Sequence, residues 1–215
     1  YTTLFRSDQQ LAALTPPRKH YQRYFCSREA NDDMMNSRQG LSAFLRAYFH
    51  CKSGDWAGNQ PFTLRAWSPD ELVKMPAYYI MDLHAGMPET VAGLLPSDEE
   101  IKACRWLPEN ELRFYTQEFQ RTGFQGGLQW YRCMFREEQD RELALYHGRS
   151  IDVSACFIGG AKDWGVFQLP GALETMQSTA CSNMKSVDLI PGAGHWVQQE
   201  RPDEVAQLLT RFLKS

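Results

Sequence analysis

The hydrophobic positions in the first two thirds of the chain recur with the period of a helix. Between residues 41 and 49, leucine, phenylalanine and tyrosine side chains are spaced i, i+3, i+4, i+7 and i+8, which predicts a helix that ends near His50. Residues 97–101 (SDEEI) have the S-x-x-E spacing of a capping box, and another helix is expected to open at Pro108. The pattern therefore predicts a series of short helices over residues 40–136.

After Gly148 the pattern changes to short apolar runs that are typical of buried strands. Residues 151–158 (IDVSACFI) and 187–190 (VDLI) are bounded by glycine or Pro-Gly and predict two strands, with a helix candidate at 170–177 between them. A last helix is expected to begin at Pro202 and to bury a stripe that consists of Val205, Leu208, Leu209, Phe212 and Leu213.

This order of strand, helix, strand and helix implies a parallel βαβα unit. Two strands do not make a stable parallel sheet, because such sheets need both faces covered. We therefore expect the rest of the sheet to be supplied by a segment upstream of this chain.

Composition and charge narrow the class of protein. The chain has 215 residues, and 43% of them are hydrophobic, which is enough for a sizeable core. Its formal net charge is -3, and its lysine and arginine residues are scattered along the sequence. This balance argues against nucleic acid as a partner. Because no segment approaches the roughly 18 apolar residues that cross a bilayer, we expect no membrane span.

The six cysteines are far apart and form no C-x-x-C motif, so they indicate neither a zinc site nor a disulfide framework. A reducing compartment follows from this usage, and we expect a cytoplasmic protein.

Candidate chemistry lies in the loops that follow the two predicted strands. Asp163 comes after the first strand (GGAKDWG) and His195 after the second (PGAGHW). Because the carboxyl ends of parallel strands share one edge of a sheet, these two side chains are expected to meet there. An acid that orients an imidazole, so that the imidazole can deprotonate water, is half of a hydrolase triad.

Three segments, HYQRYF, FQGGLQWYR and GAGHWVQQERPDEV, together resemble the epoxide hydrolases of the α/β-hydrolase fold. The resemblance covers nearly the whole chain. It implies an α/β fold that is incomplete here, with a mainly helical cap over residues 1–148 and the C-terminal segment of the core, its last parallel βαβα unit, over residues 149–215. The N-terminal part of the core, which carries the nucleophilic aspartate in that family, is absent from this chain, as is the family's H-G-x-P motif.

The resemblance also assigns roles to individual residues. The Y-Q-x-Y-F pattern places one cap tyrosine at Tyr21, and the G-x-L-x-W-Y-R pattern places the other at Tyr131. The histidine of the family falls on His195, and the acid that orients it falls on Asp163. Two phenols would donate to the oxygen of an opening epoxide, a carboxylate would form an alkyl ester, and the His–Asp pair would activate the water that releases a vicinal diol. This chemistry requires no metal and no organic cofactor, only a small apolar epoxide and water.

The stretch SGDWAG around Asp55 imitates the turn that presents a nucleophile. Such a turn joins a buried strand to a helix, whereas Asp55 follows a predicted helix, and in the family the nucleophile precedes both cap tyrosines. We therefore interpret SGDWAG as a cap loop, and we expect this chain to be inactive without the upstream segment.

Other interpretations stay open at this point. A haloalkane dehalogenase of the same fold would use the same ester chemistry, but a halide leaves without a proton and gives the two phenols no purpose. A non-catalytic, hydrolase-derived binding module would cover its open sheet edge with another chain, and a homodimer is a related possibility. Three tryptophans that adjoin the proposed site residues, Trp130, Trp164 and Trp196, are candidates for an apolar substrate pocket.

Overall fold

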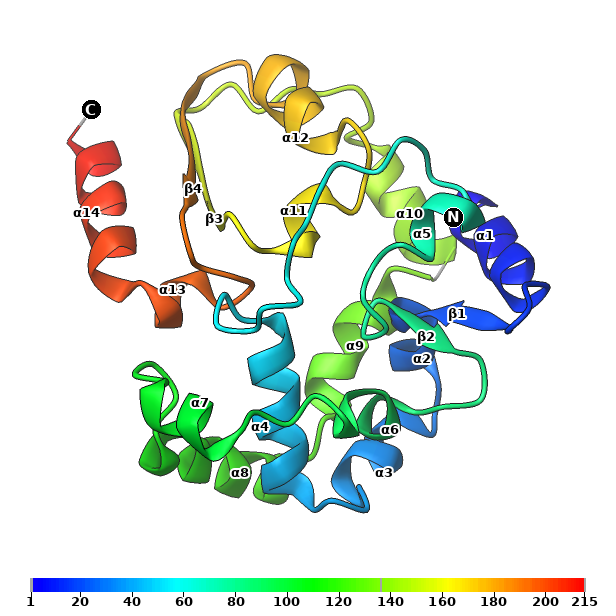
Figure 1. Ribbon diagram of the computed structural model, residues 1–215. Coiled ribbons are helices and arrows are strands. Elements are labelled where there is room, and N and C mark those ends of the chain that lie inside the picture. Colours follow the sequence, from blue (N-terminus) through cyan, green and yellow to red (C-terminus); the bar gives the residue numbers. More distant parts are fainter. Residues whose placement is uncertain (1, 136, 215) are drawn as a thin grey trace.

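The computed structural model describes residues 2–135 and 137–214 (Figure 1). Its helical elements, in chain order, are α1 (Thr2–Ala12), α2 (Tyr21–Cys26), α3 (Ala30–Met35), α4 (Leu41–Lys52), α5 (Pro69–Leu72), α6 (Met87–Ala92), α7 (Asp98–Ala103), α8 (Glu109–Thr122), α9 (Gln125–Cys133), α10 (Glu137–Ala144), α11 (Trp164–Phe167), α12 (Ala172–Thr175), the π-helical turn η1 (Met176–Ala180), α13 (Val197–Glu200) and α14 (Pro202–Leu213). The strands are β1 (Arg18–His20), β2 (Ile80–Asp82), β3 (Ala155–Gly160) and β4 (Met184–Ile190).

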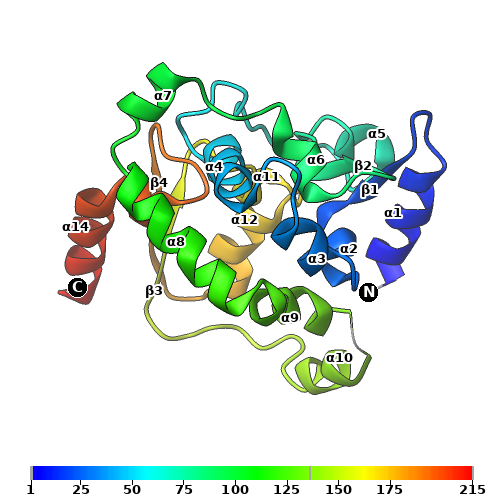
Figure 2. The same cartoon turned by 90° about the horizontal axis from the view of Figure 1, so that it is seen from below.

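Helix α4 runs through the middle of the molecule and joins the helical part to the strands (Figure 1). It confirms the helix predicted over residues 41–50, and Leu41, Phe44, Leu45 and Phe49 of the expected apolar face are buried. The helix packs against α6 and α8, and Figure 2 shows α8 and α9 below it in that view. The predicted capping box also forms, because Ser97 Oγ accepts from the Glu100 N–H at 3.2 Å and the Ser97 N–H donates to Glu100 Oε2 at 2.7 Å.

Strands β3 and β4 pair in parallel, as predicted, with a register irregularity at Ala155 and Cys156. The first strand begins later than expected, because Ile151 forms only an isolated bridge with Cys181. It also continues through Gly159 and Gly160, which were expected to end it. Glycine is required at position 160 because a Cβ there would collide with backbone atoms of Ala193 and Gly194 in the loop that carries His195.

Figure 1 shows α14 on one side of this strand pair and α11 and α12 on the other. The predicted helix at 170–177 appears as α12 followed by η1. The expected buried stripe of α14 is wrong: none of its described residues is buried, and Leu209 and Leu213 are 44% and 81% exposed. A sheet of two strands is too narrow to cover this helix, and for the same reason only the last two residues of β3 are buried.

A second pair, β1 and β2, is antiparallel, with Arg18 opposite Asp82 and His20 opposite Ile80. This pair is not predictable from the sequence, because strands of three residues are too short to show an alternation of apolar and polar positions. This pair ends directly at α2 and so fixes where Tyr21 lies. Among the described residues, we find no helix with the length and apolar character needed to span a bilayer.

Candidate functional site

The structure brings Asp163 and His195 together at the edge where β3 and β4 end. The Nδ1 atom of His195 lies 3.1 Å from Asp163 Oδ2 and 3.2 Å from Oδ1. Asp163 is the N-cap of α11 and accepts the Gly165 N–H at 2.7 Å, which fixes the carboxylate. With Nδ1 engaged by the acid, Nε2 of His195 is left to exchange a proton with a substrate or with water.

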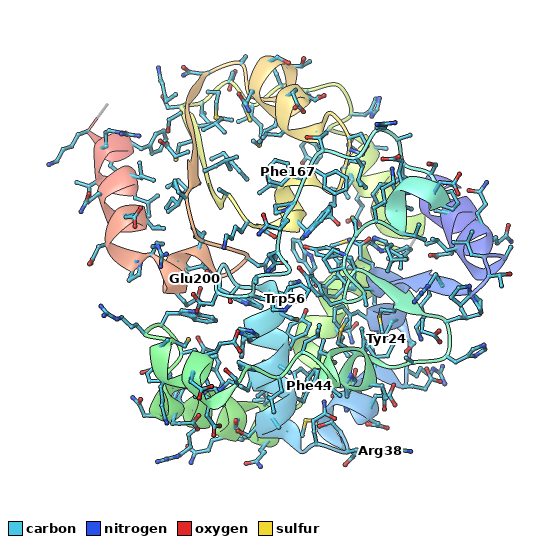
Figure 3. The ribbon with its side chains drawn as sticks, in the orientation of Figure 1. Tyr24, Arg38, Phe44, Trp56, Phe167 and Glu200 are labelled. Carbon is cyan, nitrogen blue, oxygen red and sulfur yellow. The ribbon has the colours of Figure 1, made fainter. Side chains whose placement is uncertain are left out.

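The loop that carries His195 is held by a buried carboxylate on α13. Glu200 accepts backbone N–H groups from Gly54 at 2.7 Å, Gly194 at 2.9 Å and Trp196 at 3.0 Å. The His195 N–H itself donates to the Lys52 carbonyl at 2.9 Å. Figure 3 shows Glu200 close to the end of α4. The end of α4 and the loop after β4 are thus tied together by backbone hydrogen bonds, which sets the position of the imidazole.

Tyr21 and Tyr131 come from α2 and α9, which pack against each other. Their ring centroids are 6.0 Å apart and the rings are nearly perpendicular, at 79°. Burial raises the pKa of Tyr131 to about 12 and moves the pKa of Tyr21 still further above its usual value of 10. Both phenols therefore keep their protons at neutral pH and can act as hydrogen-bond donors.

The electrostatics of the His–Asp pair favour an ionised acid and a neutral base. Burial pushes the pKa of Asp163 upward, but the hydrogen bond to His195, the N–H of Gly165 and the charge of Lys52 outweigh it, and the net shift is downward. Burial and then the charge of Lys52 lower the pKa of His195, against the opposing effect of Asp163. An imidazole that is neutral near pH 7 is available as a general base.

Lys52, at the end of α4, is a charged group near the site that is not among the residues predicted from the sequence. Its side chain is buried with the residue only 5% exposed, beneath Tyr21 and beside Trp196. The sequence does indicate that Lys52 is buried. Residues 41, 45, 48 and 52 follow the i, i+4, i+7, i+11 spacing of one helix face, so Lys52 lies on the same face as the apolar stripe. Glu200, five residues after His195, was missed as well, and no spacing rule points to it.

A cavity of about 420 Å³ lies between α4, α8 and α9. Its walls are mostly aromatic and aliphatic, and they include Tyr131 and Trp196, so the cavity adjoins both a phenol and the neighbour of His195. The remaining lining residues are Phe25, Met34, Phe44, Leu45, Tyr48, Phe49, Tyr115, Phe119, Phe124, Gly127, Leu128 and Gln199.

The three candidate pocket tryptophans have different surroundings. Trp196 lines the cavity and donates from Nε1 to the Phe49 carbonyl at 2.9 Å. Trp164 is buried against Phe62, with ring centroids 5.1 Å apart, and is not part of the lining. Trp130 is 71% exposed and also lies outside the lining. The geometry therefore supports a pocket role for Trp196 and gives none to the other two.

Asp55 lies in the turn after α4, as the cap-loop interpretation of SGDWAG expects. Its carboxylate is exposed and accepts the Trp106 indole N–H at 2.9 Å. The glycine before it is explained by packing, because a Cβ at Gly54 would collide with the backbone of Gly192. Among the described residues, we find no group of three histidine, cysteine or acidic side chains placed to hold a metal ion.

Comparison with known proteins relates this geometry to one family. No family model matches the chain. The chain is 39% identical over 137 residues to epoxide hydrolase A of Mycobacterium tuberculosis and 38% identical over 112 residues to epoxide hydrolase B of that organism. These matches cover 62% and 50% of this chain, and 39% and 30% of the relatives.

Solved structures give the same result. An epoxide hydrolase from an endophytic Streptomyces superimposes with a TM-score of 0.73 at 25% identity, over 97% of this chain and 55% of that one. Epoxide hydrolase A of Mycobacterium thermoresistibile superimposes with a TM-score of 0.65 at 31% identity, over 92% and 53%. The chain thus has part of an α/β-hydrolase fold and spans about half the length of these structures. It belongs to the epoxide hydrolase family of α/β hydrolases.

Proposed function

We propose that this chain supplies the cap and the acid–base half of an enzyme that hydrolyses an epoxide to a vicinal diol. The observation that carries the proposal is that one apolar cavity is lined both by Tyr131, whose ring lies 6.0 Å from that of Tyr21, and by Trp196, the neighbour of His195. The nucleophilic carboxylate would come from an upstream segment.

In the first step the upstream carboxylate attacks one carbon of the epoxide ring. A bond forms between a carboxylate oxygen and that carbon, and the C–O bond of the ring breaks with its electron pair on oxygen. Tyr21 and Tyr131 donate hydrogen bonds to this oxygen, and one of them transfers its proton. The product is a hydroxyalkyl ester on the enzyme and a phenolate. Donors that are already oriented stabilise the developing charge without further reorganisation.

In the second step a water molecule gives a proton to Nε2 of His195 as its oxygen attacks the ester carbonyl. The tetrahedral intermediate then releases the alcohol and regenerates the carboxylate, and the imidazolium returns its proton to the phenolate. Asp163 keeps the imidazole in the tautomer with the proton on Nδ1 and stabilises its charged form. The sum is one epoxide and one water giving one diol.

The phenol pair favours an epoxide over a haloalkane as substrate. A halide leaves as a stable anion and takes up no proton, so a reaction that releases it does not need two protonated phenols as acids. The aromatic walls of the cavity favour an epoxide that carries an uncharged aryl or alkyl group. A non-catalytic binding module would use the cavity but would have no need for the Asp163–His195 contact.

The test uses the complete polypeptide, with the upstream segment restored, and an aryl epoxide as substrate. Replacing Tyr21 and Tyr131 together by phenylalanine should lower diol formation by roughly 10²–10⁴-fold, the usual contribution of general acid catalysis. Tyr24→Phe is the matched control, because the Tyr24 hydroxyl donates to Asp33 at 3.3 Å, away from the cavity. His195→Gln should instead accumulate the ester, which mass spectrometry detects on an upstream carboxylate.

Two results would overturn the proposal. Full activity in the double phenylalanine variant would remove the phenols from the mechanism. An ester on Asp55 would show that SGDWAG presents the nucleophile after all.

A further inference from the structure

The Lys52 ammonium occupies a cage of aromatic rings. It lies 5.2 to 5.9 Å from five ring centroids, which belong to Tyr21, Tyr48, Tyr78, Tyr79 and Trp196. Within the described ranges, no carboxylate forms an ion pair with it. Taking an ammonium out of water is costly unless other groups compensate, and ring faces compensate only in part. A buried charge at this point therefore calls for a reason beyond packing.

The cage lies between the two halves of the proposed active site. Tyr21, one of the two phenols, forms one wall, and Trp196, next to His195, forms another. The Lys52 carbonyl accepts the His195 N–H at 2.9 Å, so the lysine is fixed to the loop that carries the base. The positive charge is thus held beside the groups that exchange protons in the reaction.

Several titratable groups face Lys52 from the elements packed around it. They come from α2, α4, the segment before β2, α9 and the loops after β3 and β4, and they are Tyr21, Tyr48, Cys51, Tyr78, Tyr79, Tyr131, Asp163 and His195. Asp163 is the carboxylate among them, and it is already engaged by His195.

The charge of Lys52 favours the protonation states that the mechanism uses. It opposes the effect of burial on Tyr131 and so keeps the pKa of that phenol lower than burial alone would. It also lowers the pKa values of His195 and Asp163. These effects give a more acidic proton donor, a neutral base and an ionised orienting acid.

We propose that Lys52 is an electrostatic positioning residue for ring opening, an inference that rests on the proposed function. Its caged ammonium stabilises the negative charge that passes to the epoxide oxygen and to the phenol that gives up its proton, and it acts through these groups without touching the substrate. A fixed, pre-oriented charge in a site shielded from water is an effective form of such stabilisation.

The test compares Lys52→Met with Lys52→Arg and Lys19→Met in the complete enzyme. Lys19 is the matched control, because its ammonium lies 5.2 Å from the ring of Tyr24, outside the proposed site. Lys52→Met should slow single-turnover ester formation by roughly tenfold or more and should move both limbs of the kcat/KM–pH profile to higher pH. Lys52→Arg, which keeps the charge, should retain the wild-type profile, and Lys19→Met should leave rate and profile unchanged.

An unchanged pH profile in a folded Lys52→Met enzyme would overturn the proposal, whether or not the rate falls, because a purely structural lysine would not move the limbs. If that variant fails to fold, NMR of labelled lysine in the wild-type protein decides: the proposal requires a protonated Lys52 at pH 7, and a neutral amine overturns it. Wild-type enzyme that forms no diol would refute the proposed function instead. NMR titration of His195 would still test the lysine, and equal His195 pKa values in wild type and Lys52→Met would refute its electrostatic role.

Discussion

The buried imidazole of His20 should make the fold sensitive to acid. His20 is the N-cap of α2, where its Nδ1 accepts the Gln22 N–H at 3.4 Å, and it is only 2% exposed. Its Nε2 is buried without a hydrogen-bond partner among the described residues. Burial lowers the pKa of His20 from 6.5 to about 4, because the charged ring would lose its hydration without gaining an acceptor.

The sign and size of the effect follow from this difference in pKa. Between pH 6.5 and about 4 the unfolded chain binds a proton at His20 that the folded protein does not, so the free energy of unfolding falls as the pH falls. Each unit of pKa difference corresponds to about 1.4 kcal/mol, so the full loss is roughly 3 kcal/mol, of which about 2 kcal/mol appears between pH 7 and pH 5.

Urea unfolding at pH 7 and pH 5 measures this loss. His20→Asn keeps a capping oxygen and stays neutral, so it should be less stable at pH 7 but should lose about 2 kcal/mol less than the wild type between the two pH values. His84→Asn, at an exposed position, should keep the wild-type pH dependence. Equal pH dependence in wild type and His20→Asn would refute the reasoning, because it would mean that the buried ring is protonated at little cost.

Two further predictions concern the residues that hold the site. Glu200→Ala should lower the free energy of unfolding by about 3–4 kcal/mol, because it leaves three backbone N–H groups without an acceptor, at about 1 kcal/mol or more each. Glu200→Gln should lose less stability, because its amide oxygen can still accept two of these N–H groups. Equal losses of the two variants in urea unfolding would contradict this prediction. Asp163→Asn should lower turnover in the complete enzyme by roughly 10²–10⁴-fold. It should also lower the pKa of His195, because it removes the carboxylate that raises this pKa. An NMR titration of His195 that is the same in the variant and the wild type would contradict the second expectation.

Local signals in the sequence were enough to predict the elements that depend on neighbouring residues. The apolar spacing gave α4, and the S-x-x-E motif gave the capping box of α7, because both depend on contacts within a few residues. The parallel pairing of β3 with β4 also followed, since a strand–helix–strand order leaves few alternatives. This pairing is what brought Asp163 and His195 into contact.

Features that depend on distant segments could not be predicted in this way. Gly160 is expected from the sequence to end a strand, but in the structure its lack of a side chain leaves room for the backbone of residues 193–194 to lie against it. The spacing of residues in the sequence does not reveal this contact. The stripe of α14 was expected to be buried because its period is regular, but burial also requires a partner of sufficient width. The role of Lys52 depends on rings from four separate segments, and only its position on the apolar face of α4 hinted at it.

Burial differs sharply between the helical part and the strand pair. The large buried cluster is built almost entirely from the helical part, and Trp164 is its one member among the described residues after Gly148. Around the strand pair, by contrast, Ile151, Val153 and Leu213 are 51%, 67% and 81% exposed. A parallel sheet is stable when both faces are covered, so added strands would bury the surface that is open here. Tyr21, Tyr131, the caged Lys52 and the apolar cavity already have their packing within this chain, so under the proposed function the complete enzyme would have to add only the nucleophile and the strands that cover this sheet.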